Sequence, residues 1–248
     1  MRWVRIAGLV VIVGLLASYY ALRSHKPTPG APENFGKSTH LLLVETETFD
    51  SSGATIRLYQ RGSGSDQWKS NAEPMPATVG RNGLGWGHTF RDHAAAGEPI
   101  KMEGDKRAPA GVFPLGRPFG LSPDGLPHYM QLKDGGHFCV DDAGSEKYSQ
   151  IVPADAIPEG TSGERMWEIS LYKRGVVVDY PTDRAAKSGS CIFLHVWKNP
   201  QTATVGCVAT SEDTVARLQK WVSQAPNGAW IAIVPRAARG RLGLNLPD

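Results

Sequence analysis

The chain has 248 residues, of which 41% are hydrophobic and 21% are charged, and its formal net charge is +3. A chain of this length can bury a sizeable core without metals or cross-links, and it fits one domain with appendages or at most two small domains. Its lysines and arginines are scattered and form no basic stripe with interleaved aromatic residues, so nucleic acid is excluded as an expected partner. The 28 glycines and 18 prolines, together with many short apolar runs, favour a β-rich domain with many turns.

The N-terminal segment carries Arg2 and Arg5, followed by an uncharged stretch over residues 6–22. At about 1.5 Å per residue a helix of this length reaches about 25 Å, slightly less than a bilayer core. Residues 1–22 therefore predict a signal peptide or an N-terminal membrane anchor. The anchor is favoured because Tyr19 is too bulky for a small-x-small cleavage site and suits a membrane interface. We expect a periplasmic or cell-envelope protein, held in the inner membrane by residues 6–22 or secreted after cleavage.

The segment after the apolar stretch changes character. Residues 23–38 are rich in proline and glycine and lack apolar periodicity, which predicts a linker. Residues 39–236 are expected to form the folded domain. Residues 237–248 form a polar, arginine-containing tail that we expect to be loosely held.

The first half of the domain indicates short strands separated by turns. Leu41–Thr48 and Ala54–Gln60 read as two strands joined by a turn at residues 51–53. The stretch Gly80–Gly87 (GRNGLGWG) holds too many glycines for a helix interior and indicates a loop where the backbone passes close to another segment. A phosphate-binding loop is excluded because no strand–loop–helix context and no Gly-Lys-Ser/Thr follows. Val112–Leu115 predicts a short strand.

The second half adds apolar strands and the clearest helix of the chain. The expected strands are Arg174–Asp179, Cys191–Trp197 and Ala229–Val234. The helix begins after Thr210 or Ser211, either of which can cap it, and its apolar residues share one face. Those apolar residues are Val215, Leu218 and Val222. Pro-Asn-Gly at residues 226–228 ends the helix.

The cysteines are Cys139, Cys191 and Cys207. An odd number of cysteines in an exported chain leaves at least one free thiol or an intermolecular bond. A disulfide between Cys139 and Cys191 would leave Cys207 free. The connectivity stays open at this point because it cannot be read from the sequence.

A thiol and an imidazole make the strongest candidate for chemistry. His195 lies on an apolar strand before Cys207, and an adjacent imidazole is what a cysteine needs to become a reactive thiolate. Gly206 removes bulk beside the sulfur, and backbone N–H groups around Val205–Cys207 can face a developing oxyanion. The alternative interpretation is that the cysteine is a small buried hydrophobe and the histidine a satisfied core residue.

Several segments resemble one enzyme family. SGSCIFLHVW (188–197) followed by TATVGCVAT (202–210) resembles the catalytic signature of YkuD-type L,D-transpeptidases, a histidine strand followed by a Ser/Thr-x-Gly-Cys turn. GDKRAPAGVFPLG (104–116) resembles a second conserved stretch of that family. GRNGLGWG and CVDD (139–142) resemble its exported peptidoglycan L,D-transpeptidase subgroup. The resemblance covers roughly residues 40–235.

The resemblance implies a fold and a reaction. The implied fold is mainly β (a β-rich α+β fold), with the curved, mostly antiparallel sheets of the L,D-transpeptidase catalytic domain and one main helix after the nucleophile. The implied reaction is acyl transfer on peptidoglycan stem peptides through a thioester on Cys207, with no cofactor and no metal. His195 would take the thiol proton and return one to the leaving amine. Thr204 matches the family's Ser/Thr position, and Val205 and Gly206 belong to the oxyanion turn.

Two details of the resemblance bear on the substrate. Ala209 stands where many members carry arginine, so recognition of a substrate carboxylate must come from elsewhere. The connection between His195 and Cys207 is short, which predicts a small lid. The family also implies that a main-chain carbonyl near residues 193–197, or further along the chain, orients the imidazole.

Other polar and aromatic residues are weaker candidates. Asp141 and Asp142 can bind a substrate amine, although paired acids after a strand are typical turn formers. Trp197 can contact glycan, although packing is favoured for it. For the remaining residues we favour structural roles: turn formation for Asp105 and Arg107, packing for Trp86, and surface positions for His88, His93, His128 and His137, which lack metal-ligand spacing. Glu164 and Arg165 can form an ion pair or line the cleft, and the ion pair is favoured.

Alternative functions remain open at the level of the sequence. The same site suits an L,D-carboxypeptidase, an endopeptidase or another envelope amide hydrolase, because all would share one acyl-enzyme. A non-catalytic cell-wall binding module is the alternative from another class. The sequence makes no prediction of the oligomeric state.

Overall fold

The computed structural model describes residues 32–65 and 67–244. The predicted signal peptide or anchor at residues 1–22 and the first part of the linker lie outside the described residues, as do residues 245–248. Within the described ranges, no helix has both the length and the apolar character needed to cross a membrane.

The described chain is mostly β, as expected for the fold class. Its larger sheet contains β1 (His40–Thr46), β2 (Gly53–Gln60), β3 (Lys69–Ser70), β4 (Met75–Thr78), β5 (Leu84–Trp86), β6 (Ala108–Gly120), β7 (Met130–Gln131), β11 (Gly175–Val178), β12 (Phe193–Val196), β13 (Val208–Thr210) and β14 (Ala229–Pro235). A smaller sheet contains β8 (Phe138–Val140), β9 (Ile151–Val152) and β10 (Gly163–Arg165). The helices are α2 (Glu212–Ser223) and the 3₁₀ segments η1 (Glu33–Lys37), η2 (His88–His93), η3 (Ala154–Ala156), η4 (Met166–Glu168), η5 (Ser170–Lys173) and η6 (Arg236–Leu242).

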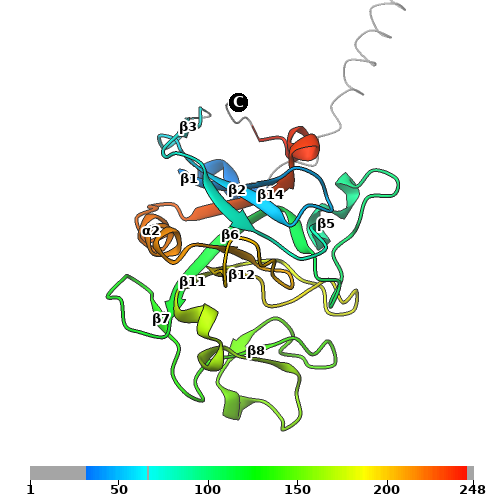
Figure 1. The fold of residues 1–248 in the computed structure, drawn as a ribbon, viewed down its shortest axis with the longest axis vertical. Helices are drawn as coiled ribbons and strands as arrows, with labels where there is room; N and C mark the ends of the chain where they lie inside the picture. Colours follow the sequence, from blue (N-terminus) through cyan, green and yellow to red (C-terminus); the bar gives the residue numbers. More distant parts are fainter. Residues whose placement is uncertain (1–31, 66, 245–248) are drawn as a thin grey trace, which may run out of the picture. The chain divides into compact units, whose positions relative to one another are not determined.

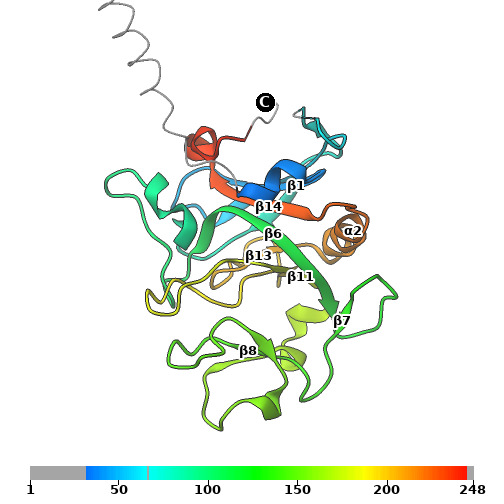
Figure 2. The same ribbon diagram turned by 180° about the vertical axis from the view of Figure 1, so that it is seen from behind.

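The larger sheet closes on itself. Its strands follow the order β1-β14-β6-β11-β12-β13-β4-β2, and β1 pairs with β2 as well as with β14. The β1–β14 and β12–β13 pairs are parallel, whereas the other neighbours in this order are antiparallel. In both views the smaller sheet lies beyond β11 and β12, on the side away from β1 and β14 (Figures 1 and 2).

The central strands carry the continuous apolar runs that their position requires. Every residue of β1 and β14 is buried, and the run Leu41–Val44 has no exposed surface. A strand covered on both faces cannot alternate between apolar and polar residues. The continuous apolar run in LLLVET therefore agrees with the place of β1 in the sheet, where both faces of the strand are covered.

Strand β6 is longer than the sequence indicates. We expected a short strand at Val112–Leu115, but β6 spans Ala108–Gly120 and pairs with both β14 and β11. The prolines of β6 kept its full length from being predicted, because a proline has no N–H to donate to a neighbouring strand and is therefore uncommon in an interior strand. Pro114 stands opposite Trp230 and Pro118 opposite Val176, so the sheet tolerates both.

The glycine-rich stretch Gly80–Gly87 does bring backbones close together. Gly83 has φ +78°, and a Cβ there would lie 1.9 Å from the Phe49 carbonyl oxygen. No larger residue fits this position without moving the backbone. The stretch is not wholly a loop, however, because Leu84–Trp86 forms β5 and pairs with the start of β6.

Helix α2 forms as the sequence predicts. The Ser211 side chain caps it by accepting a hydrogen bond from the Thr214 N–H at 3.2 Å, and Val215, Leu218 and Val222 are buried. Gln219 is also fully buried, and its side-chain amide donates to the carbonyl oxygens of Phe119 and Gly175. These bonds fix the helix against β6 and β11.

Both predicted borders of the domain need correction. The linker was predicted to run to residue 38, yet Phe35 in η1 is 6% exposed and packs on Trp68 and Trp230. The tail was predicted to be loose from residue 237, yet η6 continues to Leu242, which is fully buried. Arg241 adds a bidentate ion pair with Glu98 at 2.7 and 2.8 Å, which lowers the pKa of that carboxyl to about 2.

Replacing Phe35 by alanine is expected to destabilise the domain by about 3 kcal/mol, because a buried phenyl ring is lost and leaves a cavity. Urea unfolding of the full chain measures this value. Phe35→Leu serves as the control and should recover most of the loss, since it refills the space between Trp68 and Trp230. A change below about 0.5 kcal/mol, the range of ordinary surface substitutions, would place Phe35 outside the core.

Candidate active site

The two residues predicted to carry the chemistry lie on neighbouring parallel strands. His195 is on β12 and pairs in register with Ala209 of β13, while Leu194 pairs with Val208. Cys207 immediately precedes β13 and is therefore offset from His195 by two residues. Side chains two residues apart share a face of a sheet, and Cα atoms offset in this way across adjacent strands are about 8 Å apart. The thiol and the imidazole lie on one face of the sheet, where the Tyr172 ring packs against His195 and belongs to the same buried cluster as Cys207.

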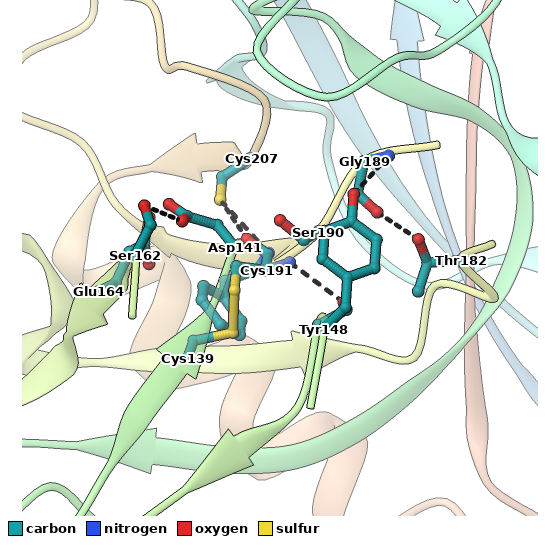
Figure 3. The surroundings of a disulfide bond; sticks show 12 residues. Cys139, Asp141, Tyr148, Ser162, Glu164, Thr182, Gly189, Ser190, Cys191 and Cys207 are labelled. Atoms are coloured by element: carbon teal, nitrogen blue, oxygen red, sulfur yellow. Dashed lines mark hydrogen bonds between the residues drawn. A yellow bond between two sulfur atoms is a disulfide. The ribbon is translucent and has the colours of Figure 1, made fainter. Parts of the chain in front are cut away.

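Cys207 lies in a cleft of about 240 Å³. The cleft is lined by Lys101, Glu103, Gly104, Lys106, Asp141, Glu164, Ser190, Cys191, Ile192, Val205, Gly206 and Cys207. Figure 3 shows Cys207 directed toward the main chain of Cys191, with Asp141, Ser162 and Glu164 grouped to one side. Four chain regions therefore border the cleft: the loop before β6, the smaller sheet with its following turn, the segment before β12 and the turn before β13.

The sulfur of Cys207 is a buried, protonated thiol in this structure. Its Sγ accepts a hydrogen bond from the Phe193 N–H at 3.4 Å and donates one to the Cys191 carbonyl at 3.5 Å. Burial raises the pKa of Cys207 to about 12, and the negative charge of Glu164 adds to the effect, whereas the Phe193 N–H and the Lys101 charge oppose it. Any nucleophilic role of Cys207 therefore requires that the thiol first lose its proton.

The imidazole of His195 is oriented by the protein main chain. Its Nδ1 lies 2.9 Å from the Val196 carbonyl oxygen, and because a carbonyl only accepts, Nδ1 carries the proton and Nε2 is left as the acceptor. Burial lowers the pKa of His195, which keeps the ring neutral. Val196 thus supplies the orienting carbonyl that was expected near residues 193–197.

The resting arrangement differs from a thiolate–imidazolium pair. Among the described residues, neither ring nitrogen of His195 is hydrogen-bonded to Cys207 Sγ. Burial acts on both groups in the direction of the neutral form, because a charge is costly where water is excluded. In this structure the thiol and the imidazole are therefore not paired with each other.

The turn before Cys207 is closed by Thr204. The Thr204 hydroxyl donates to the Cys207 carbonyl at 2.7 Å and accepts from the Gly206 N–H at 3.1 Å. Gly206 has φ +153°, and a Cβ there would lie 3.3 Å from the Arg107 carbonyl oxygen. Since its N–H is already bonded within the turn, Gly206 is not an open oxyanion donor at rest. Val205 lines the cleft and is 59% exposed.

The glycine-rich motifs support this turn. Gly80 forms an isolated bridge with Thr204, the Arg81 N–H donates to the Thr204 carbonyl, and the Thr204 N–H donates to the Val79 carbonyl, both at 2.9 Å. The GDKRAP stretch borders the cleft through Gly104 and Lys106. The motifs on which the family resemblance rests therefore meet around one turn.

Asp105 and Arg107 hold the GDKRAP turn as predicted. Asp105 accepts hydrogen bonds from the Met102 and Arg107 N–H groups and from Lys101 Nζ at 2.6 Å. Arg107 donates to the carbonyl oxygens of Phe49 and Leu84. These bonds fix the backbone beside the cleft and leave Lys101 buried at its edge.

Carboxyl groups line one side of the cleft, and each is held by a hydroxyl. Asp141 accepts from Ser162 Oγ at 2.5 Å, Glu164 from Tyr172 Oη at 2.7 Å, and Glu103 from Ser190 Oγ at 2.7 Å and from the Tyr148 hydroxyl. Burial is the main cause that raises the pKa of Glu164 to about 7, with the charges of Asp141 and Glu103 adding to it. The predicted Glu164–Arg165 ion pair is wrong, because Arg165 pairs with Glu168 at 3.6 Å.

Several sequence candidates lie elsewhere. Asp142 accepts from the Gly144 N–H at 2.7 Å and is a turn former, and neither it nor Trp197 is among the described residues that line the cleft. Trp86 is fully buried, which agrees with a packing role. His93 stacks on Trp86 and is not a free surface residue. Within the described ranges, the structure places no group of three or more His, Cys, Asp or Glu residues so that it could hold a metal ion.

Cys139 and Cys191 form a disulfide, which was left open by the sequence. The bond joins β8 of the smaller sheet to the segment that enters β12, and it leaves Cys207 as the free thiol of the chain. Cys191 has φ +52°, an uncommon conformation for a residue with a side chain. The disulfide thus fixes the smaller sheet, with Asp141 and Glu164, beside Cys207 (Figure 3).

Comparisons with known proteins give little further information. No protein-family model matches the sequence, and no curated protein matches it. Among solved structures, the chain is similar to the crystal structure of the helical cell shape determining protein Pgp2 from Campylobacter jejuni, with 13% sequence identity and a TM-score of 0.42. The match covers 79% of this chain and 48% of that chain, so this protein spans about half the length of Pgp2. A similarity at this level carries no argument about function.

Proposed function

We propose that this protein is a cysteine acyltransferase of the cell envelope that acts on peptidoglycan stem peptides as an L,D-transpeptidase. Cys207 is the nucleophile and His195 the base. The observation that carries the proposal is the placement of a free thiol at the wall of a cleft, on the same sheet face as an imidazole whose ring is fixed by a backbone carbonyl. The family resemblance of the segments around this turn supplies the substrate class.

The reaction follows from the protonation states of the two groups. Substrate binding brings the carbonyl after the third stem residue to Cys207, and the Sγ proton passes to Nε2 of neutral His195 as sulfur attacks. The imidazolium returns the proton to the amine of the terminal D-alanine, which leaves, and a thioester remains on Cys207. An amine of a second stem peptide then takes the acyl group, while water would give an L,D-carboxypeptidase or endopeptidase instead.

Burial accounts for the different roles proposed for the Cys207 thiol and the His195 imidazole. A thiol with a raised pKa is mostly protonated and reacts slowly with electrophiles from solution, and a histidine with a lowered pKa is unprotonated at neutral pH and free to accept a proton. Both shifts come from the exclusion of water. The raised pKa of the thiol is also the observation that favours the second candidate, a wall-binding module without catalysis.

Trapping the acyl-enzyme tests the proposal. Wild-type protein mixed with a disaccharide-tetrapeptide and quenched in acid should gain the mass of the acyl donor without D-alanine, and peptide mapping should place it on Cys207. A carbapenem should give a stable adduct at the same residue. If neither reagent modifies Cys207 while the cleft is intact, the catalytic proposal fails and the wall-binding candidate takes its place.

A further inference from the structure

Tyr172 occupies a position that the proposed reaction does not use. It lies on η5, is 4% exposed, and its ring meets the ring of His195 edge-on at 5.2 Å and that of Phe193 at 5.4 Å. Its hydroxyl donates to Glu164 Oε2 at 2.7 Å. Tyr172 and Cys207 also belong to the same buried cluster beneath the cleft. The residue therefore adjoins the proposed base, the proposed nucleophile and a half-buried carboxyl at once.

The hydroxyl of Tyr172 has one proton and two neighbours that can accept it. One is Glu164, which receives it in this structure. The other is the sulfur of Cys207, which belongs to the same buried cluster and is not hydrogen-bonded to Tyr172 in this structure. A single donor cannot serve a carboxylate and a thiolate together. The choice between them depends on the charge of Glu164.

We propose that Glu164 and Tyr172 are positioning residues for Cys207, in which the carboxyl, by gaining or losing a proton, decides whether the tyrosine hydroxyl supports the thiolate. When Glu164 is ionised, it holds the Tyr172 proton and its charge opposes a second negative charge on sulfur. When Glu164 takes a proton from water, its own O–H donates to Tyr172 Oη, and the Tyr172 proton is released toward Cys207 Sγ. This inference rests on the proposed role of Cys207 as the nucleophile and deepens it.

The surroundings of Glu164 favour proton uptake near neutral pH. From β8 and its following turn it faces Asp141, from the loop before β6 it faces Glu103, and from the turn before β13 it faces Cys207. The positive groups that line the same cleft are Lys101, which is bound to Asp105, and Lys106. Among the described residues, no lysine, arginine or histidine forms an ion pair with Glu164. Burial and like charge therefore act together, and they agree with its raised pKa of about 7.

The rate of alkylation of Cys207 as a function of pH tests the inference directly. Under non-reducing conditions the Cys139–Cys191 disulfide is intact, so iodoacetamide reports on Cys207 alone. Glu164→Gln is permanently neutral, and its amide can donate to Tyr172 as the protonated acid does. We expect this variant to lower the apparent pKa of Cys207, to raise the alkylation rate about tenfold at pH 8, and to lose an inflection near pH 7 that wild type shows.

The double variant Glu164→Gln/Tyr172→Phe separates the effect of the Tyr172 hydroxyl from simple repulsion between the negative charges of Glu164 and Cys207. In a Tyr172→Phe background, Glu164→Gln should raise the rate less than threefold, because no hydroxyl remains to be released. An equal gain in both backgrounds would overturn the role of Tyr172, and identical pH profiles for wild type and Glu164→Gln would overturn the whole inference. Both outcomes are read only from variants whose thermal unfolding shows an intact domain. The variant Glu164→Asp keeps a carboxylic acid and should therefore show the inflection of the alkylation rate near pH 7 that Glu164→Gln loses.

A matched control is available on the adjoining helical turn. Glu168 is an exposed carboxylate that pairs with Arg165, and Glu168→Gln should leave the alkylation profile unchanged. The measurement requires no peptidoglycan. Failure to form an acyl-enzyme would therefore refute the proposed function and leave this result standing, whereas an unchanged profile with normal acylation would refute the inference alone.

Discussion

Replacing Cys207 by alanine is expected to reduce turnover of tetrapeptide muropeptides by a factor of about 10⁴ or more, the size of effect seen when a catalytic nucleophile is removed. The reason is that the acyl group has no other thiol to occupy, since Cys139 and Cys191 are joined in a disulfide. The neutral imidazole of His195 can accept a proton, but it has no partner to deprotonate. Mass spectrometry of the reaction products measures the loss.

The fold should survive this substitution. Alanine removes the acceptor of the Phe193 N–H bond, a cost of about 1–2 kcal/mol. Cys207→Ser is the matched control, because its oxygen restores an acceptor near Phe193 yet is a much weaker nucleophile in this setting. Both variants should unfold near the wild-type temperature. Wild-type product formation by the folded alanine variant would exclude Cys207 as the nucleophile.

Removing the disulfide is expected to lower the stability of the domain by about 4 kcal/mol, because the Cys139–Cys191 bond closes a loop with a sequence separation of 52 residues. The double variant Cys139→Ala/Cys191→Ala provides the test in urea unfolding. Wild-type protein with a reductant should match the variant, while the variant itself should not respond to the reductant. Cys207→Ala, which keeps the disulfide, controls for effects of thiols in general.

The same variant should also disturb the cleft before the domain unfolds. Asp141 and Glu164 reach the nucleophile from the smaller sheet, and the disulfide ties that sheet to the residue whose carbonyl accepts the Cys207 thiol proton. We expect faster proteolysis within residues 138–165 in the variant. A stability change below 1 kcal/mol would show that packing alone holds the smaller sheet in place.

Local chemistry explains which elements could be predicted. Helix α2 was visible because its cap, its acidic first turn and its apolar face are all encoded within a few residues of Ser211. Strands β1 and β2 were visible because a short turn separates two runs of apolar residues. Strand β6 was seen only in part, because its pairing on both sides outweighs the local disfavour of Pro114 and Pro118, and that outcome depends on strands distant in sequence.

The residues of the candidate site also fall into those that could be predicted from the sequence and those that could not. Cys207, His195 and Thr204 could be chosen from the sequence because they lie close together along the chain in recognisable surroundings. Tyr172 could not, and Glu164 was only the less favoured cleft candidate, because no local pattern places either residue beside the sulfur. The smaller sheet, η5 and a disulfide bring them there. The only local hint was a glutamate next to Arg165, and that arginine proved to pair with Glu168.

The position of β14 has a consequence for the order of folding. The last strand of the chain lies between β1 and β6, parallel to the first strand, so early and late residues are neighbours in space. Until residue 235 is available, β1 and β6 present unpaired backbone edges, which are templates for wrong pairing with other chains. Closure of the sheet is therefore a late event that depends on contacts distant in sequence, a feature that slows folding. A chain that lacks β14 is therefore expected to aggregate through the edges of β1 and β6.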